Sequence, residues 1–409
     1  MKEVDVLVVG AGAAGCFTSI ITAENFPNAS VLIFEKSNKI LAKVKVSGGG
    51  RCNVTNELSE PNELCKSYPR GEKFLKKAFY QFSSKHMMEW LERKGVKLSV
   101  QSNGCVFPES NSSQTIIDCF VQEMNRLNVV VETNQHVADI QKMDANTFKV
   151  QTKSTTILAR KIIVTVGGQP KSSGFDFLSS FSLNFVPPVP SLFTFNLPNQ
   201  DTQSLMGLSQ DSVRVRLEGE KWFTSGSLLF THWGMSGPAI LKASAIGARI
   251  LEAKAYNTAF YVNWTGVDNQ EDAKEKLFEL QQSSKLLVNT PVFSLKARLW
   301  EFLLNKIGFH ASLRGNELTL KHINKLVELL SNDKYLMSGK TTFKEEFVTA
   351  GGISLNQINV NTMEANAIPG LYFAGEALDI DGITGGFNFQ AAWTTAYIAG
   401  SNVLKTKNL

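Results

Sequence analysis

The chain has 409 residues, of which 43% are hydrophobic and 19% charged, so it is a globular protein of two or three domains and not a disordered or collagen-like chain. Its 42 Lys and Arg residues exceed its 37 Asp and Glu residues by only five and form no basic tract, so no nucleic-acid partner is expected. Five cysteines without a C-x-x-C pair argue against a disulfide framework or a zinc site, and no metal is expected. The sequence has no recognisable export signal and no run of 18 apolar residues, so a cytoplasmic protein without a membrane span is expected.

The first 35 residues predict a strand, a glycine turn, a helix and a second strand that ends in an acid. Residues 4–9 and 30–34 are typical of buried strands, and residues 16–25 suit a helix. In such a unit the glycines permit a tight turn and the close approach of a pyrophosphate, while Glu35 can bind a ribose diol, which favours FAD or NAD over NADP. The turn expected to bind the dinucleotide consists of Gly10, Ala11, Gly12, Ala13, Ala14 and Gly15.

A second glycine cluster follows, and it distinguishes FAD from NAD. Three consecutive glycines are costly inside a helix or strand, so they are expected where the backbone passes close to a ligand. A nicotinamide dehydrogenase has no need of such a loop here, whereas a cofactor whose pyrophosphate leads on to a flavin does, so non-covalent FAD is expected. The neighbouring arginine could lower the pKa of Cys52, but no second cysteine lies nearby to form a dithiol. The cluster consists of Ser47, Gly48, Gly49, Gly50, Arg51, Cys52 and Asn53.

The next hundred residues alternate between helical and strand patterns. They predict an amphipathic helix within 74–94, strands within 96–108, a helix over 115–125, and strands over 129–132 and 161–168. Three prolines within residues 187–190 then predict a linker into a further domain.

The domain organisation follows from these changes in pattern. We expect an FAD-binding domain from residues 1–190 and 346–409, interrupted by an insertion. The insertion is expected to comprise a β domain, a helical subdomain and a short return, at residues 191–265, 266–335 and 336–345. It contains no second strand–G-x-G-x-x-G–helix unit, so any NADH or NADPH would bind only transiently, as an electron donor.

Three blocks of sequence resemble a bacterial family of FAD flavoproteins that includes aminoacetone-oxidase-like proteins and a bile-acid dehydro-intermediate reductase. The blocks are SGGGRCNVTN at 47–56, GSLLFTHWGMSGP at 226–238, and the stretch 349–400. The chain departs from the family pattern at 36–43 and within 356–366, so the resemblance does not extend to the substrate. It implies an α/β fold of the glutathione-reductase-like superfamily, with an FAD-binding Rossmann domain and an inserted β-rich and helical substrate or cap domain.

The same resemblance implies further contacts with the cofactor. The strand at 161–168 would pass beneath FAD, Val137 would lie near the adenine, and a helix beginning near residue 387 would point its N-terminus at the flavin. Gly375 and Glu376 would lie near the ribityl chain and the pyrophosphate. The additional residues expected to bind FAD are Lys36, Lys43, Val137, Thr165, Gly167, Gly168, Gly375, Glu376, Gly385, Gly386, Phe387 and Asn388.

The expected function is that of an FAD-dependent oxidoreductase that acts on a small organic substrate by hydride transfer through flavin N5, linked to NADH or NADPH. His232, in the middle block, is the candidate catalytic proton donor or acceptor. Two alternatives stay open: an amine or alcohol oxidase that uses O2, and a flavin-binding protein in RNA modification. The sequence does not set the oligomeric state.

Overall fold

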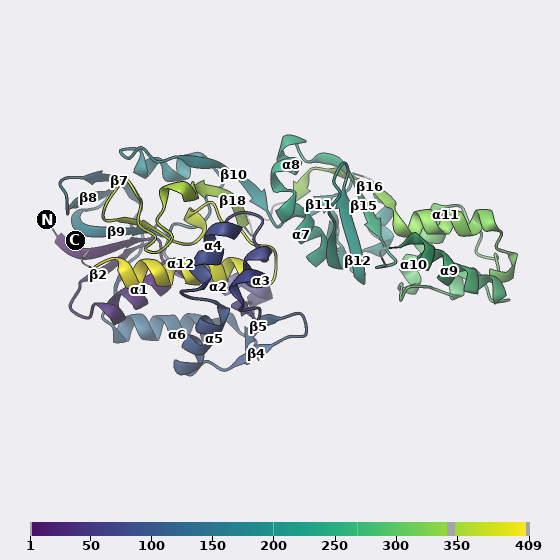
Figure 1. Cartoon of the computed structure of the whole chain (residues 1–409), viewed down its shortest axis with the longest axis horizontal. Coiled ribbons are helices and arrows are strands. Elements are labelled where there is room, and N and C mark those ends of the chain that lie inside the picture. Colours follow the sequence, from purple (N-terminus) through teal and green to yellow (C-terminus); the bar gives the residue numbers. More distant parts are fainter. Residues whose placement is uncertain (1, 199, 268, 342–347, 406–409) are drawn as a thin grey trace. The chain divides into compact units, whose positions relative to one another are not determined.

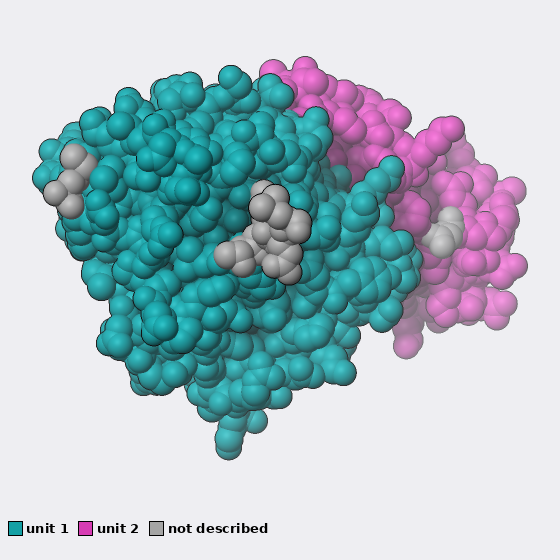
Figure 2. All heavy atoms as spheres, turned by 60° about the vertical axis from the view of Figure 1, so that its left-hand side comes forward, with its two compact units in different colours: residues 1–190, 348–409 teal, residues 191–347 magenta. Residues whose placement is uncertain are grey.

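The computed structural model describes residues 2–198, 200–267, 269–341 and 348–405. The chain forms two compact units, one from residues 1–190 with 348–409 and one from residues 191–347 (Figure 2). The predicted boundary between residues 345 and 346 lies outside the described residues. No helix within the described ranges is long and apolar enough to cross a membrane.

The first unit contains a seven-stranded sheet in the order β6-β2-β1-β9-β8-β7, with β19 also paired to β9. Strands β6, β2, β1, β9 and β19 run parallel, whereas β7 and β8 continue the sheet as antiparallel strands. All four residues of β2 are buried, as expected of a parallel strand covered on both faces. The strands are β1 (Lys2–Val9), β2 (Val31–Phe34), β6 (Val130–Glu132), β7 (Val137–Lys142), β8 (Phe148–Thr152), β9 (Thr156–Val164) and β19 (Leu371–Phe373).

Three long helices, α1 (Ala13–Asn25), α6 (Ser113–Arg126) and α12 (Phe387–Asn402), belong to the same unit. Figure 1 shows α1 and α12 side by side, and the two pack against each other although they lie at opposite ends of the sequence. A Cβ on Gly400 would come within 2.7 Å of the Thr18 carbonyl oxygen, so this glycine permits the close packing. The C-terminal helix α12 therefore packs beside α1, the helix that follows the first glycine turn.

The first unit also contains four short helices and a second, three-stranded sheet. The predicted amphipathic helix within 74–94 is instead two helices, because the chain turns after Tyr80 and Ser83 caps the second helix together with His86. The elements are the helices α2 (Ala42–Gly50), α3 (Pro61–Leu64), α4 (Glu72–Phe79) and α5 (Ser84–Arg93), and the three-stranded sheet β3 (Thr55–Asn56), β5 (Cys105–Pro108) and β4 (Leu98–Val100).

The chain does enter the second unit directly after the prolines at 187–190, but these residues do not form an irregular linker. These prolines lie within a strand, β10 (Phe185–Ser191), which pairs with β18 (Val348–Ile353) in a two-stranded sheet. Proline cannot donate to a strand ladder, but it is tolerated in an edge strand whose donors are not all needed. A Cβ on Gly351 would come within 2.7 Å of the Pro187 carbonyl oxygen, which explains the glycine opposite the prolines.

The second unit combines an antiparallel sheet with helices. Its seven strands have the order β16-β15-β12-β13-β14-β11-β17. They are β11 (Thr194–Asn196), β12 (Ser209–Leu217), β13 (Thr224–Phe230), β14 (Gly234–Ser236), β15 (Asn257–Asn263), β16 (Asp333–Ser338) and β17 (Lys340–Thr341). Its helices are α7 (Pro238–Ile246), α8 (Ala248–Ala253), α9 (Gln270–Phe278), α10 (Ala297–Lys306) and α11 (Leu320–Ser331). Phe195, Phe260, Trp264 and Trp300 are fully buried in its own hydrophobic core.

Candidate functional site

The carboxyl ends of the parallel strands bring most of the predicted cofactor residues together. Strand β1 leads into Gly10, β2 into Glu35, β9 into Thr165, and β19 into Gly375 after Ala374. These strands are neighbours in one sheet, so the four residues lie along one edge. In open α/β sheets this edge is where ligands bind.

The first glycine turn is packed too tightly for side chains at two of its three glycines. Gly10 has a φ of +106°, and a Cβ there would come within 2.7 Å of the Thr165 carbonyl oxygen. A Cβ on Gly15 would overlap the carbonyl oxygen of Gly10. Thr165 fastens the turn by donating its hydroxyl to the carbonyl oxygens of Val9 (3.0 Å) and Gly10 (2.9 Å). Both glycines therefore serve the packing of helix on strand.

Gly12 is different, because the space beside it is open. An added Cβ would meet no described atom within 4 Å, and the φ of −82° is one that any residue adopts. Gly12 is also the N-cap of α1, and no side chain caps the helix there. The N-terminus of α1, with its partial positive charge, therefore begins beside an open space that a phosphate could enter.

The Glu35 carboxylate holds the turn in place. One oxygen accepts a hydrogen bond from the Ala11 N–H (2.8 Å), and the other accepts from the N–H (2.9 Å) and hydroxyl (2.8 Å) of Ser37. The Glu35 carbonyl oxygen accepts from the Gln135 N–H (2.8 Å). Val137 therefore begins β7 two residues beyond this contact, and its side chain is buried.

The second glycine cluster forms an open left-handed loop at the end of α2. Gly48, Gly49 and Gly50 have φ values of +56°, +68° and +85°, and the dihedral angles from Ser47 to Gly49 are not helical. A Cβ on Gly48 would come within 2.9 Å of the Asn53 nitrogen, whereas Cβ atoms on Gly49 or Gly50 would meet no described atom within 4 Å. The loop therefore combines one packed glycine with two that leave bare backbone beside open space, as a closely approaching ligand requires.

The three residues after the glycines point in different directions. The Arg51 guanidinium lies 4.4 Å from the centre of the Phe107 ring, and its Nε donates to the Gly48 carbonyl oxygen (3.2 Å), so it is engaged within its own loop. Burial raises the pKa of the Cys52 thiol to about 12, the opposite of the lowering that Arg51 could have caused. Asn53 connects the loop to α12: with its side-chain amide assigned so that the oxygen faces Gly386, this oxygen accepts from the Gly386 N–H (3.1 Å).

Lys43 and Glu376 meet at the same edge although 333 residues separate them. The Lys43 ammonium lies 2.9 Å from the Glu376 carboxylate, which also accepts from the Gly168 N–H (3.2 Å). Gly375 packs against α1, since a Cβ there would come within 2.9 Å of the Ala14 Cβ. By contrast, Lys36 is exposed on the surface.

The start of α12 closes this group of residues. Gly386 caps the helix with a φ of +90°, and a Cβ there would overlap the Thr55 carbonyl oxygen. The Asn388 amide exchanges two hydrogen bonds with the Gly382 backbone (2.8 and 2.9 Å), and the Phe387 carbonyl oxygen accepts from the Tyr68 hydroxyl (2.7 Å). The first turn of α12 contains no acidic residue, so its N–H groups and helix dipole favour a negative charge in front of them.

Several residues that support this edge have no signal in the sequence. Arg70 forms an ion pair with Asp381, whose carboxylate is fully buried just before the Gly385–Gly386 turn. The Asn56 amide donates to the Gly385 carbonyl oxygen (3.1 Å). These partners lie more than 300 residues apart, and only the fold brings them together.

His232 belongs to the second unit. It is exposed in the turn between β13 and β14, next to Trp233, which is 58% exposed. The turn is closed by the Thr231 N–H, which donates to the Gly234 carbonyl oxygen (2.8 Å). The catalytic role of His232 stays a prediction.

Comparison with known families identifies the chain. Residues 4–402 match the family described as the HI0933-like protein Rossmann domain, and the chain belongs to this FAD-binding family. The family assignment supports the predicted Rossmann fold, FAD as the cofactor, and an oxidoreductase. The open glycine turns at Gly12 and at Gly49–Gly50 fit this cofactor.

The chain is similar in sequence to enzymes with different names and similar in fold to a solved structure. The chain is 28% identical over 421 residues to the ribosomal RNA dihydrouridine synthase of Escherichia coli, covering 100% of both chains. It is 25% identical to the 3-dehydro-bile acid delta(4,6)-reductase of Clostridium scindens, covering 96% of this chain and 97% of that one. The 3-ketosteroid-delta4-(5alpha)-dehydrogenase of Rhodococcus jostii shares the fold, with a TM-score of 0.52, 13% identity, and coverage of 99% and 97%. The resemblance to aminoacetone-oxidase-like proteins stays a prediction.

Proposed function

We propose that this member of the HI0933-like family is a reductase that saturates a carbon–carbon double bond conjugated to a carbonyl, using FAD and electrons from NADH or NADPH. The observation that carries the proposal is what the names of two relatives have in common. One is named for making dihydrouridine, which is uridine with its ring double bond saturated, and the other is named as a delta(4,6)-reductase. Their substrates differ, but both names describe the addition of two hydrogens to an alkene.

The first unit offers a consistent set of contacts for the cofactor. The N-terminus of α1 at Gly12 would bind the diphosphate, and Glu35 would bind the adenosine ribose by exchanging one of its present hydrogen bonds. The loop Gly48–Gly50 would lie against the cofactor without side chains to obstruct it. Held there, FAD would supply the hydride chemistry that couples oxidation of a reduced nicotinamide to reduction of the alkene at its β-carbon.

The residues of the chain would supply charge stabilisation and the proton. The N-terminus of α12, capped by Gly386, would stabilise negative charge on the pyrimidine part of the flavin ring. The α-carbon of the alkene needs one proton to complete the reaction, and the exposed imidazole of His232 is the candidate donor. The second unit would act as the substrate or cap domain.

Anaerobic mixing distinguishes this proposal from an oxidase. Stopped-flow absorbance of the FAD-loaded protein with NADH or NADPH should show flavin bleaching, followed by recovery when a cyclic enone is added. The matched control replaces the enone with its saturated ketone, which should give no recovery. Bleaching by an amine or alcohol, with peroxide released in air, and no response to reduced nicotinamides would refute the proposal.

A further inference from the structure

The outer face of the antiparallel sheet in the second unit carries arginines and aromatic rings. On β12, Val213, Val215 and Leu217 are buried, so Arg214 and Arg216 between them point to the opposite face. The register places Arg214 opposite Asn263 and Arg216 opposite Tyr261 on β15. Tyr261 in turn lies opposite Lys334 on β16. One side of the three strands therefore presents cations, a ring and an amide together.

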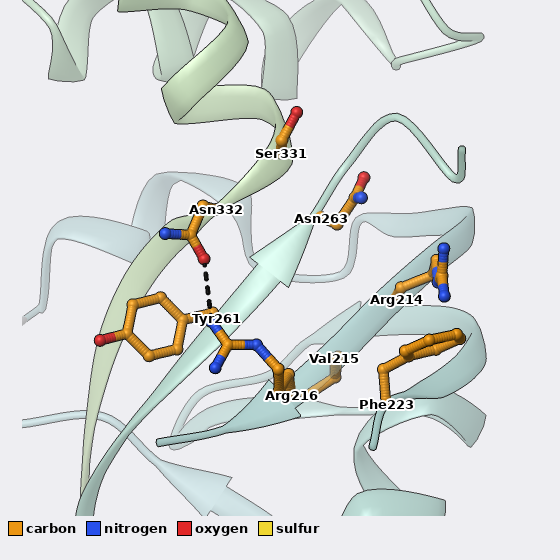
Figure 3. A pocket seen from close by; sticks show the side chains of 8 residues that line it. All are labelled: Arg214, Val215, Arg216, Phe223, Tyr261, Asn263, Ser331 and Asn332. Atoms are coloured by element: carbon orange, nitrogen blue, oxygen red, sulfur yellow. Dashed lines mark hydrogen bonds between the residues drawn. The ribbon is translucent and has the colours of Figure 1, made fainter. Parts of the chain in front are cut away.

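The cations lie against aromatic rings. The Arg214 guanidinium is 3.2 Å from the centre of the Phe223 ring, which is 50% exposed, and the Arg216 guanidinium is 4.6 Å from the centre of the Tyr261 ring. The Lys334 ammonium is 5.7 Å from the same tyrosine ring. Figure 3 shows these two arginine–aromatic pairs on neighbouring parts of the sheet.

A pocket of about 400 Å³ lies over these pairs. Asn332 at its edge accepts a hydrogen bond from Arg216 (3.2 Å), which holds this guanidinium in place (Figure 3). The Ser331 hydroxyl oxygen is buried at the pocket and has no hydrogen-bond partner among the described residues. Asn263 also lines the pocket. The pocket thus combines charge, flat surfaces and polar groups that can donate or accept.

This combination is suited to a nucleic acid strand. Aromatic rings and guanidinium planes stack on bases, while the positive charges bind phosphates, and antiparallel sheets with exposed aromatic residues bind single-stranded RNA in this way. Two acids lie beside this region. Glu218 is contacted by Lys334 (3.2 Å) and by the Tyr261 hydroxyl (3.4 Å), and Glu328 accepts a hydrogen bond from the Asn332 amide (3.2 Å).

We propose that this sheet face, formed by β12, β15 and β16 with Phe223, binds single-stranded RNA that carries the uracil ring to be reduced. The proposal rests on the proposed reduction of a conjugated double bond, because the uracil C5=C6 bond is conjugated to the C4 carbonyl. The name of the Escherichia coli relative, which already supports the proposed reduction, also specifies RNA as that protein's substrate. The proposal differs from the sequence-based expectation of no nucleic-acid partner. That expectation used the total charge and the absence of a basic tract, and neither reveals a cluster of cations that three separate strands bring together.

Binding is tested with the FAD-loaded full chain and a fluorescein-labelled, uracil-rich 12-nucleotide RNA, by fluorescence anisotropy. Arg216→Gln combined with Tyr261→Leu should weaken binding at least about fivefold, the lower end expected for the loss of one base stack. Phe223→Leu should also weaken RNA binding, because it removes an aromatic ring and leaves the backbone unchanged. The matched control is Lys276→Gln on α9, which removes one exposed charge away from the sheet and should bind as the unchanged protein does.

Three results would overturn the proposal: no measurable binding by the unchanged protein, equal binding by the double variant and Lys276→Gln, or equal binding of an abasic strand with the same phosphates. The last result would mean that charge alone acts and that no base stacks. Thermal unfolding of each variant shows whether a loss of binding comes from a loss of fold.

Turnover of a cyclic enone with NADPH separates this inference from the proposed function. Enone turnover that persists without RNA binding would refute only the RNA inference. RNA binding without reduction of either the enone or RNA uracil, the latter read by mass spectrometry as a gain of two hydrogen atoms, would refute the proposed function. We expect both activities in the unchanged protein, and loss of RNA reduction with retained enone turnover in the double variant.

Discussion

Gly12 and Gly15 lie three residues apart in one turn, and the structure predicts opposite consequences for the same substitution. Gly12→Ala places a methyl group where no described atom lies within 4 Å, at a φ that alanine adopts readily. Gly15→Ala places it into the Gly10 carbonyl oxygen and within 2.7 Å of the Thr165 hydroxyl oxygen. The first change should therefore affect the bound cofactor, and the second should affect the fold.

The magnitudes follow from these surroundings. Gly12→Ala should change the free energy of unfolding of the FAD-stripped protein by no more than about 1 kcal/mol, the usual scale of a helix N-cap change. It should weaken FAD binding about 10- to 150-fold, because one lost charge-assisted hydrogen bond to a phosphate costs about 1.5–3 kcal/mol. Gly15→Ala should lower the free energy of unfolding by about 1–3 kcal/mol, since the overlapping atoms are the Gly10 carbonyl and the Thr165 hydroxyl, which hydrogen-bond to each other at the ends of β1 and β9.

Urea unfolding of the stripped protein measures the first quantity, and titration with FAD by flavin fluorescence measures the second. Gly12→Ala and Gly15→Ala serve as controls for each other, because both replace a glycine with an alanine. FAD binding by Gly12→Ala that equals that of the unchanged protein would refute the assignment of this space to the diphosphate. Unfolding of Gly15→Ala at the same urea concentration as the unchanged protein would refute the packing argument.

Three further predictions concern single side chains. Glu35→Gln should weaken FAD binding about tenfold or more in the fluorescence titration, because a neutral amide is a poorer partner for the Ala11 N–H and a ribose diol; unchanged affinity would contradict this. Cys52 should resist alkylation by iodoacetamide at pH 8 in the folded protein, because burial raises its pKa to about 12 and leaves almost no thiolate; peptide mass mapping before and after unfolding checks this. His232→Ala should lower kcat for enone reduction and alter its pH profile, and turnover unchanged across pH would remove this residue from the mechanism.

The sequence predicts those parts of the fold that depend on local pattern. The βαβ unit up to Glu35 and the turns at Gly12 and Gly49 follow from glycine spacing and apolar runs, whose physical reasons act within a few residues. The proline strand β10 could not be predicted in this way, because its partner β18 lies far along the chain. The break between α4 and α5 was also missed, since the apolar spacing continues through it.

The same distinction applies to the site. Residues proposed to contact the cofactor through bare backbone have a glycine signal, whereas those that hold the backbone in place have none. Arg70 and Asp381 are ordinary charged residues in the sequence, and only the fold pairs them beneath the turn before α12. Arg214 and Arg216 likewise occur in an alternating strand pattern that predicts their outward direction but not the rings of Phe223 and Tyr261 beside them.

The absorption spectrum of the purified protein tests the central claim most directly. The account predicts a yellow protein with close to one flavin per chain, released intact as FAD when the protein is denatured. A colourless protein that takes up no flavin from an excess of FAD would contradict it, because the open backbone at Gly12 and at Gly49–Gly50 would then have no ligand.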